Sequence, residues 1–231
     1  MTLGDANVAA AAALIGEPAR AAMLDALMDG GARSASELAR SAGVAPSTAS
    51  GHLARLREGR LVACETQGRQ RLFRLSSPLV ADALETLARI APPRADRSLR
   101  AANASEAIRH ARTCYDHLAG FVGVGVTEAL VASGALRSLD GAYELTLSGE
   151  RMLTGLGVDV GAARASRRAF ARKCVDWSER RPHLAGALGA ELARALVAHG
   201  WFVRRPQDRG LRITELGTAG LGQLGVVAAG G

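Results

Sequence analysis

The stretch that decides the fold is residues 34–57, which reads SASELARSAGVAPSTASGHLARLR. Ser34 with Glu37 three residues later forms a capping box, and this predicts the start of a short helix. Gly43 predicts the turn that ends this helix. Pro46 suits the first turn of a second helix, because proline lacks the N–H that would be unpaired there. The stretch therefore predicts two short helices joined by a glycine turn.

The second of these helices is predicted to have one apolar face and one face of small polar side chains. Ala49, Leu53 and Leu56 recur at helical spacing and form the apolar face. This is typical of a helix-turn-helix, whose second helix enters the DNA major groove. A packed helix pair without DNA would favour a longer apolar stripe. The residues predicted to contact DNA from this helix are Ser47, Thr48, Ser50, Gly51, His52 and Arg55.

A basic hairpin is predicted directly after this helix. Residues 61–66 and 71–75 favour two strands, and Gly68 suits the positive φ of a tight turn between them. Arg69 and Arg71 load the hairpin with positive charge. A hairpin in this position is a wing that reaches the DNA backbone or minor groove. In isolation, an arginine-rich hairpin exposed to solvent would be an equal alternative.

Residues of about 7–90 resemble the ArsR/SmtB family of winged-helix transcriptional regulators. The resemblance rests on LIGEPAR at 14–20, ELA at 37–39 with Gly43-Val44, STASGHL at 47–53, and GRQRLFRL at 68–75. It implies a symmetric homodimer held by the first helix and the helix near 78–91. It also implies a repressor that leaves its double-stranded DNA operator when an effector binds.

The sequence departs from that family at the two metal sites for which the family is best known. The helix before the recognition helix carries no cysteine, and the helix near 78–91 has Asp82 and Glu85 but no histidine. Gly51 also stands where the family often has a bulky or basic residue. An effector is therefore not expected to bind in the N-terminal domain.

Composition limits the remaining possibilities. The chain has 231 residues, 48% of them apolar, and a net charge of +7, which fits a packed core and a nucleic-acid partner. Three widely spaced cysteines argue against a disulfide framework and for the cytoplasm. The apolar run from Val8 to Ile15 is too short to span a membrane, and we interpret it as the first helix, buried at a dimer interface.

Two domains are predicted, with the boundary at Pro92-Pro93. We expect a winged helix-turn-helix domain over 1–91, a linker over 92–104, and a second domain over 105–231. HLAGFVGVGVTEALVASGAL at 117–136 recurs as HLAGALGAELARALVAHGWF at 183–202. The second domain therefore contains two winged-helix-like repeats, about 105–160 and 161–228, expected to pack about a local two-fold axis. The predicted class is mainly α, of α+β type.

Polar residues gather at the start of each repeat and form the candidate effector site. Cys114 and His117 are three residues apart, which would place them on one face of a helix. Two thiols and two imidazoles suit tetrahedral zinc, and two thiols suit a metalloid. A redox role, an organic or anionic ligand, and purely structural roles remain open. The candidates are Cys114, Asp116, His117, Cys174, Asp176, Trp177, Arg180, Arg181 and His183.

Together these features predict a sequence-specific transcriptional regulator. We expect a dimeric repressor that is released from DNA by an effector bound in the C-terminal domain. The chain carries no phosphate-binding loop, catalytic carboxylate pair or metalloprotease helix, so we do not expect an enzyme. The alternatives are an enzyme or ligand-binding protein with a regulatory helix-turn-helix, and a DNA-binding protein without an effector.

Overall fold

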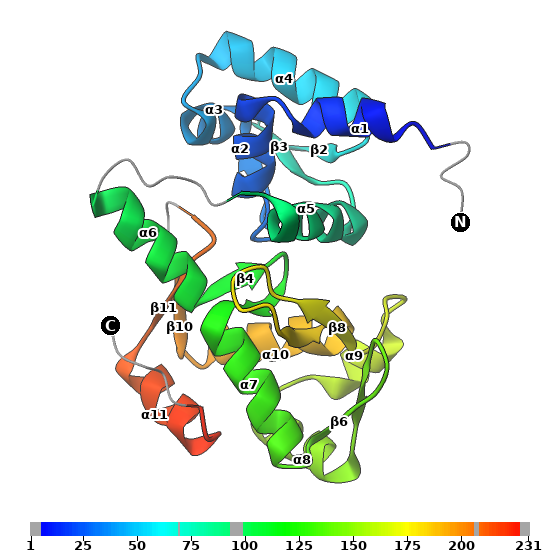
Figure 1. Cartoon of the computed structure of the whole chain (residues 1–231), viewed down its shortest axis with the longest axis vertical. Coiled ribbons are helices and arrows are strands. Elements are labelled where there is room, and N and C mark those ends of the chain that lie inside the picture. The colour runs from blue at the N-terminus through cyan, green and yellow to red at the C-terminus, as the bar shows by residue number, and fades with distance from the viewer. Residues whose placement is uncertain (1–5, 69, 93–98, 206–207, 227–231) are drawn as a thin grey trace. The chain divides into compact units, whose positions relative to one another are not determined.

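The computed structural model describes residues 6–68, 70–92, 99–205 and 208–226. The chain divides into two compact units, Met1–Leu84 and Glu85–Gly231. Helices dominate both units and the sheets are small, which confirms the predicted α+β class (Figure 1). Across the described ranges, no helix combines the length and the apolar character needed to cross a membrane.

The first unit is a winged helix-turn-helix. Its strands form one antiparallel sheet in the order β1-β3-β2. Strand β1, which pairs with Leu72 and Phe73 in the middle of β3, was not predicted. The elements are α1 (Val8–Ile15), α2 (Pro18–Ala26), β1 (Arg33–Ser34), α3 (Ala35–Ala42), α4 (Pro46–Glu58), β2 (Val62–Gln67), β3 (Gln70–Leu75) and α5 (Pro78–Ile90).

Local chemistry fixes the two helices of the motif. The Ser34 hydroxyl accepts the backbone N–H of Glu37 at 3.3 Å, and the Glu37 carboxylate accepts the N–H of Ser34 at 2.8 Å. This confirms the predicted capping box. Gly43 ends α3 with φ of +65°, a left-handed conformation that glycine adopts without strain. The apolar face of α4 is buried as predicted, since Ala49, Leu53 and Leu56 are at most 1% exposed.

The predicted hairpin is present, with a tighter turn than expected. Gln67 pairs with Gln70, so that only two residues, 68 and 69, connect β2 and β3. Gly68 has the predicted positive φ, at +61°. Arg69 lies outside the described residues.

The second unit repeats one order of elements twice. Each copy runs helix, hairpin, helix, hairpin, helix. The first copy is α6 (Leu99–His110), β4 (Arg112–Cys114), β5 (His117–Ala119), α7 (Gly120–Ala132), β6 (Leu136–Ser138), β7 (Tyr143–Leu145) and α8 (Leu147–Gly155). The second copy is α9 (Val160–Ala165), β8 (Arg172–Val175), β9 (Pro182–Ala185), α10 (Gly186–Ala198), β10 (Phe202–Arg204), β11 (Leu211–Ile213) and α11 (Glu215–Gln223).

Reciprocal contacts relate the two copies by a local two-fold axis. Arg112 at the start of β4 bridges to Gly210 of the second copy, and Ala142 of the first copy bridges to Arg172 at the start of β8. In the same way, α10 packs on β5 and α7 packs on β9. Each copy therefore completes the core of the other.

Two expectations about this unit need correction. Helix α6 begins at Leu99, within the segment predicted as a linker, and the compact units divide between residues 84 and 85, inside α5. Cys114 and His117 were expected to share one face of a helix, but they lie on the hairpin β4–β5, and the equivalent segment of the second copy is the hairpin β8–β9. We call these two hairpins the entrance hairpins.

The entrance hairpins escaped prediction because their strands are only three or four residues long, too short to show an alternating pattern. The first hairpin turns at residues 115–116, where Tyr115 adopts φ of +62°. Tight hairpin turns usually carry glycine, asparagine or aspartate at such a position. The helix that follows starts at Gly120, whose φ is +78°, and Gly186 repeats this conformation with φ of +83°.

Candidate nucleic-acid interface and metal centre

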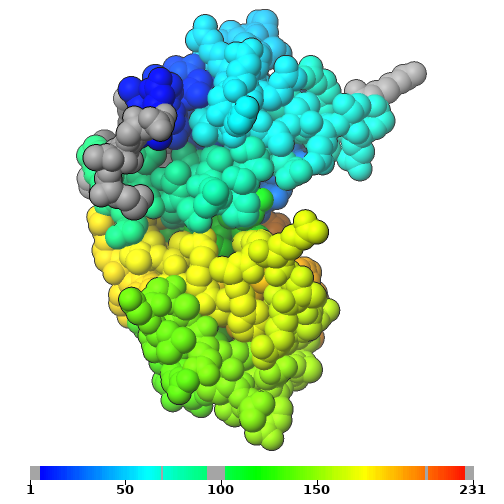
Figure 2. All heavy atoms as spheres, turned by 90° about the vertical axis from the view of Figure 1, so that its right-hand side faces the viewer, coloured from blue at the N-terminus to red at the C-terminus, as the bar shows by residue number. Residues whose placement is uncertain are grey.

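Helix α4 presents a small polar surface to solvent. Residues Ser47, Thr48, Ser50, Gly51 and Arg55 are all exposed. Figure 2 shows the cyan segments, which include α4 and the hairpin, at the surface. The Ser50 hydroxyl donates to the carbonyl of Pro46 at 3.0 Å, which leaves its lone pairs available as acceptors. Short side chains on this face let the helix backbone approach a groove closely.

His52 lies differently from the prediction. Its side chain is only 16% exposed, and its Nδ1 atom is 3.4 Å from the carboxylate of Glu17. That carboxylate also caps α2, where it accepts the N–H groups of Ala19 and Arg20. The structure therefore uses His52 to join α4 to α2 and does not support the predicted contact between His52 and a base.

Of the two hairpin arginines that were predicted to contact DNA, only Arg71 lies within the described residues. Arg71 is exposed, and its guanidinium lies 5.8 Å from the centre of the Phe73 ring, which steadies it by a cation–π contact. Arg74 is occupied differently, because its Nε donates to the carboxylate of Glu65 at 2.8 Å.

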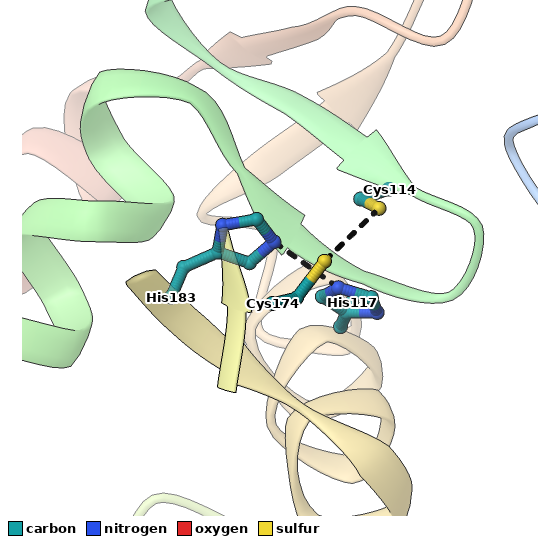
Figure 3. Close-up of side chains that lie close together, drawn as sticks. All are labelled: Cys114, His117, Cys174 and His183. Atoms are coloured by element: carbon teal, nitrogen blue, oxygen red, sulfur yellow. Dashed lines mark hydrogen bonds between the residues drawn. The ribbon is translucent and has the colours of Figure 1, made fainter. Parts of the chain in front are cut away.

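The entrance hairpins bring two cysteines and two histidines together in the second unit. We call Cys114, His117, Cys174 and His183 the Cys/His cluster. Their potential ligand atoms all lie within 4.8 Å of one another, and all four side chains are buried. The two sulfur atoms are 3.9 Å apart, and the two Nε2 atoms are 3.1 Å apart (Figure 3). These four residues lie together as predicted, although hairpins and not helices position them.

Each hairpin contributes one cysteine and one histidine as a cross-strand pair. Cys114 pairs with His117 across β4 and β5, and Cys174 pairs with His183 across β8 and β9. Directly opposite residues on an antiparallel pair point to the same face. The cluster therefore consists of two equivalent half-sites that meet where the copies pack together.

A carboxylate lies beside the second nitrogen of each imidazole. Asp116 Oδ1 is 3.3 Å from Nδ1 of His117, and Asp176 Oδ2 is 3.6 Å from Nδ1 of His183. Arg168 forms an ion pair with Asp116, and Arg112 donates to Asp176 at 2.8 Å. These carboxylates can orient the rings and select which nitrogen faces the cluster.

Asp176 is the more firmly held of the two carboxylates. Its side chain is fully buried and accepts the N–H of Gly120 at 2.7 Å and the hydroxyl of Ser178 at 2.7 Å. Burial alone would raise the pKa of Asp176, but the Arg112 charge and these hydrogen bonds outweigh it and lower the pKa. Asp176 therefore remains an anion that ties the second copy to the start of α7.

The thiols are inequivalent. A hydrogen bond with Cys114, together with hydrogen bonds to both imidazoles, lowers the pKa of Cys174 despite its burial. The same hydrogen bond, and then burial, raise the pKa of Cys114. Burial tends to lower the pKa of His117, but Asp116 and Cys174 raise it overall. One thiolate beside an imidazole is the form that ligates metals.

The remaining candidates do not converge on one binding site. Arg181 is exposed and pairs with Glu128 at 2.7 Å. Arg180 is also exposed and donates to a backbone carbonyl at 2.7 Å. Trp177 stacks under Arg112 with a guanidinium-to-ring distance of 4.7 Å. The structure therefore gives no support to an anionic ligand held by Arg180 and Arg181 beside Trp177.

Comparisons with known proteins place the chain in a family. Residues 15–65 match the family model described as "Helix-turn-helix domain". A protein of Bacillus subtilis (strain 168), "Uncharacterized HTH-type transcriptional regulator YdfF", is 43% identical over 211 residues, which cover 91% of this chain and 93% of the relative. The chain belongs to the HTH-type transcriptional regulators. The predicted winged helix-turn-helix and DNA-binding regulatory function are thereby confirmed.

Solved structures of other regulators match a smaller part of this HTH-type regulator. NolR from Sinorhizobium fredii is 28% identical, with a TM-score of 0.34, and the match covers 36% of this chain and 82% of NolR. The "cadmium metal-sensor CMTR" from Mycobacterium tuberculosis is 31% identical, with a TM-score of 0.32, covering 38% of this chain and 99% of that one. At these TM-scores the likeness specifies no ligand.

Two residues of the second unit that matter for the cluster were not predicted. Arg112 and Arg168 hold the carboxylates beside the histidines, from 64 and 52 residues away in sequence. A weak signal for Arg112 exists, since Arg-x-Cys occurs at 112–114 and again at 172–174 in the duplicated segments.

Proposed function

We propose that this HTH-type regulator is a homodimeric repressor that binds a palindromic operator and releases it when an effector binds the second unit. The observation that carries the proposal is the exposed polar face of α4, set beside the arginine-bearing hairpin. Helix side chains would read base edges, and Arg71 would contact the phosphate backbone or the minor groove. The protein would act by binding in the reducing cytoplasm and not by catalysis.

The apolar surface of α1 supports the dimer. The helix reads VAAAAALI, and none of its eight residues is buried. An isolated apolar helix of this length is marginal in water, so burial against the partner chain of a dimer would stabilise it. Helix α5 adds exposed apolar side chains, since Leu79 is 76% exposed and Ile90 is 79% exposed. These are the two helices that the family resemblance assigns to the dimer interface.

The buried Cys/His cluster supports an effector site in the second unit. Its chemistry is distinct from ordinary core packing, because two thiols, two imidazoles and two carboxylates are concentrated where the copies meet. A ligand there can change operator affinity only if it favours one conformation of the protein over another.

The experiment that tests DNA binding is selection of the full chain on random duplexes, followed by titration at several salt concentrations. We expect a palindrome with half-sites about one helical turn apart and binding that weakens steeply with salt. A monomer that binds one half-site with full affinity would contradict the proposal.

Arg71→Ala should weaken binding to operator and to random duplex together, and should reduce the salt dependence by about one counterion. Arg151→Ala is the matched control, because Arg151 is an exposed arginine on α8 of the second unit. Equal losses for the two variants would assign the effect to net charge and remove the hairpin from the interface.

A further inference from the structure

We propose that the Cys/His cluster binds one Zn²⁺ ion with tetrahedral coordination, two thiolates and two imidazoles, and so joins the two copies of the second unit. The ion would be the effector of the proposed repressor, and this regulatory part rests on the proposed function. The binding site itself rests on four independent features of the cluster: its distances, its nitrogen lone pairs, its charge and its ligand types.

Two opposite edges of the cluster match the edges of a zinc tetrahedron. Zinc–sulfur bonds of about 2.3 Å give a sulfur–sulfur edge of about 3.8 Å, and zinc–nitrogen bonds of about 2.05 Å give a nitrogen–nitrogen edge of about 3.3 Å. The observed separations are 3.9 Å between the sulfurs and 3.1 Å between the Nε2 atoms. The sulfur–nitrogen separations are all within 4.8 Å, against about 3.6 Å in a zinc tetrahedron, so the side chains would draw together to bind an ion.

The orientation of the imidazoles also suits a cation between them. If each ring carries its proton on Nδ1, toward the adjacent carboxylate, each Nε2 presents a lone pair to the other. Two lone pairs at 3.1 Å repel one another unless a proton or a metal ion lies between them. A proton on the Nε2 of one ring would relieve the repulsion by a hydrogen bond to the other, and so would a metal ion bound to both Nε2 atoms.

Nδ1 of His183 gives a second sign that the site is organised for a ligand on Nε2. This nitrogen is buried without a hydrogen-bond partner, and Oδ2 of Asp176 is 3.6 Å away. A metal on Nε2 fixes the ring proton on Nδ1, and a movement of a few tenths of an ångström would complete a hydrogen bond to Asp176. This carboxylate–histidine–metal arrangement is common in zinc sites.

Charge balance favours a divalent ion. Two thiolates and two neutral imidazoles carry a charge of about −2, which Zn²⁺ neutralises, whereas buried thiolates without a cation are costly. Binding would release to solvent the protons that the ligand atoms carry. Hard ions such as Mg²⁺ and Ca²⁺ prefer oxygen ligands, so the tetrahedral S₂N₂ set selects zinc among the abundant divalent cations.

The experiment uses the reduced full chain, stripped of metal with a chelator and kept free of oxygen. Co²⁺ is the probe, because tetrahedral thiolate coordination gives it intense visible bands and a sulfur-to-metal charge-transfer band. We expect one Co²⁺ per chain, displaced by one Zn²⁺. The double variant Cys114→Ser with Cys174→Ser should lose the charge-transfer band, while Cys64→Ser should keep it, since Cys64 lies in β2 of the first unit.

A folding control separates metal loss from misfolding. Circular dichroism should show the double serine variant folded. If it is not, His183→Asn supplies the test, with at least tenfold weaker Co²⁺ binding and an altered visible spectrum expected. The proposal is overturned if the reduced, folded wild-type chain takes up no Co²⁺, or if uptake is unchanged in both variants. A Cys114–Cys174 disulfide formed in air, without metal uptake after reduction, would also overturn it and indicate a redox site.

Operator binding by the same samples distinguishes the two proposals. We expect the stripped chain to bind operator and the zinc-loaded chain to bind it at least tenfold more weakly. Equal affinity would refute zinc as the effector while leaving the metal site intact. Zinc uptake without operator binding in either state would refute the repressor and not the site.

Discussion

Replacement of Gly51 by alanine should stabilise the first unit while weakening its contact with DNA. Gly51 is an interior residue of the 13-residue helix α4 and is exposed. A Cβ atom built on it meets no other atom within 4 Å. Glycine inside a helix is less favourable than alanine by about 1 kcal/mol, chiefly because it loses more backbone entropy on folding. Because no clash offsets this difference between glycine and alanine, nearly all of it should appear as added stability of the first unit.

The readout must report on the first unit alone. The tryptophans, Trp177 and Trp201, both belong to the second unit, so tryptophan fluorescence would miss the change. Hydrogen exchange of the α4 amides is the suitable assay. A gain of about 1 kcal/mol corresponds to exchange that is about fivefold slower, because 1.4 kcal/mol is tenfold.

Gly149→Ala is the matched control, because the same substitution should there have the opposite sign. A Cβ at Gly149 in α8 would lie 2.0 Å from the backbone carbonyl oxygen of Ala135, so the backbone must move. Unchanged or faster exchange of α4 in Gly51→Ala would refute the exposed, unstrained placement of this residue.

Operator binding by Gly51→Ala tests why a glycine is present despite its cost in helix stability. Without a side chain, the backbone of α4 can approach base edges closely, and a methyl group would hold it away. We therefore expect Gly51→Ala to bind operator more weakly although it is more stable. Unchanged operator affinity in the stabilised variant would show that this face of α4 does not approach DNA closely.

Two further predictions concern stability. Hydrogen bonds from Ser34 lower the pKa of Glu37 below its usual 4.5. The stabilising effect of the Glu37 carboxylate should therefore be complete above about pH 4.5 and be lost as the pH falls through the lowered pKa. Urea midpoints measured from pH 7 to pH 3 should show this contribution of Glu37 in wild type and not in Glu37→Gln. Asp176→Asn should destabilise the second unit by about 3–5 kcal/mol, because it leaves the fully buried Arg112 without its anion. The control Glu144→Gln breaks an exposed ion pair and should cost less than about 1 kcal/mol in the same thermal melts. Equal losses for these two variants would contradict the structural role of the buried pair.

The first unit could be predicted almost completely because its signals are local. Helix α1 occupies the predicted Val8–Ile15, and the capping box, Gly43 and Pro46 mark the ends of α3 and α4 within a few residues of each cue. Strand β1 was missed because two residues carry no pattern. The contact of His52 with Glu17 was not predicted, because Glu17 lies 35 positions earlier, at the N-cap of α2, and helical spacing says nothing about such a contact.

The candidate site was only partly predictable. Duplication of the sequence identified the correct cysteines and histidines, since equivalent residues meet at a local two-fold axis. It could not reveal that Cys114 and His117 face each other across two strands, because a two-residue turn at Tyr115 is invisible to helical spacing. Cross-strand pairing and helical spacing both place such residues on one face, so the correct residues were grouped by the wrong geometry.

The Cys/His cluster is symmetric, but the carboxylates beside its two histidines are held differently, and this difference bears on metal binding. The two cysteines are 60 residues apart and the two histidines 66, because the second entrance hairpin has a connection six residues longer. That longer connection carries Asp176, which is fully buried and bound to Arg112, whereas Asp116 in the short turn is 27% exposed. His183 therefore lies beside a firmly held anion without a hydrogen bond to it, whereas His117 is hydrogen-bonded to a carboxylate that reaches solvent. A half-site of one thiol and one imidazole would hold an ion weakly, so binding needs both hairpins, and the ion would take its ligands equally from the two copies.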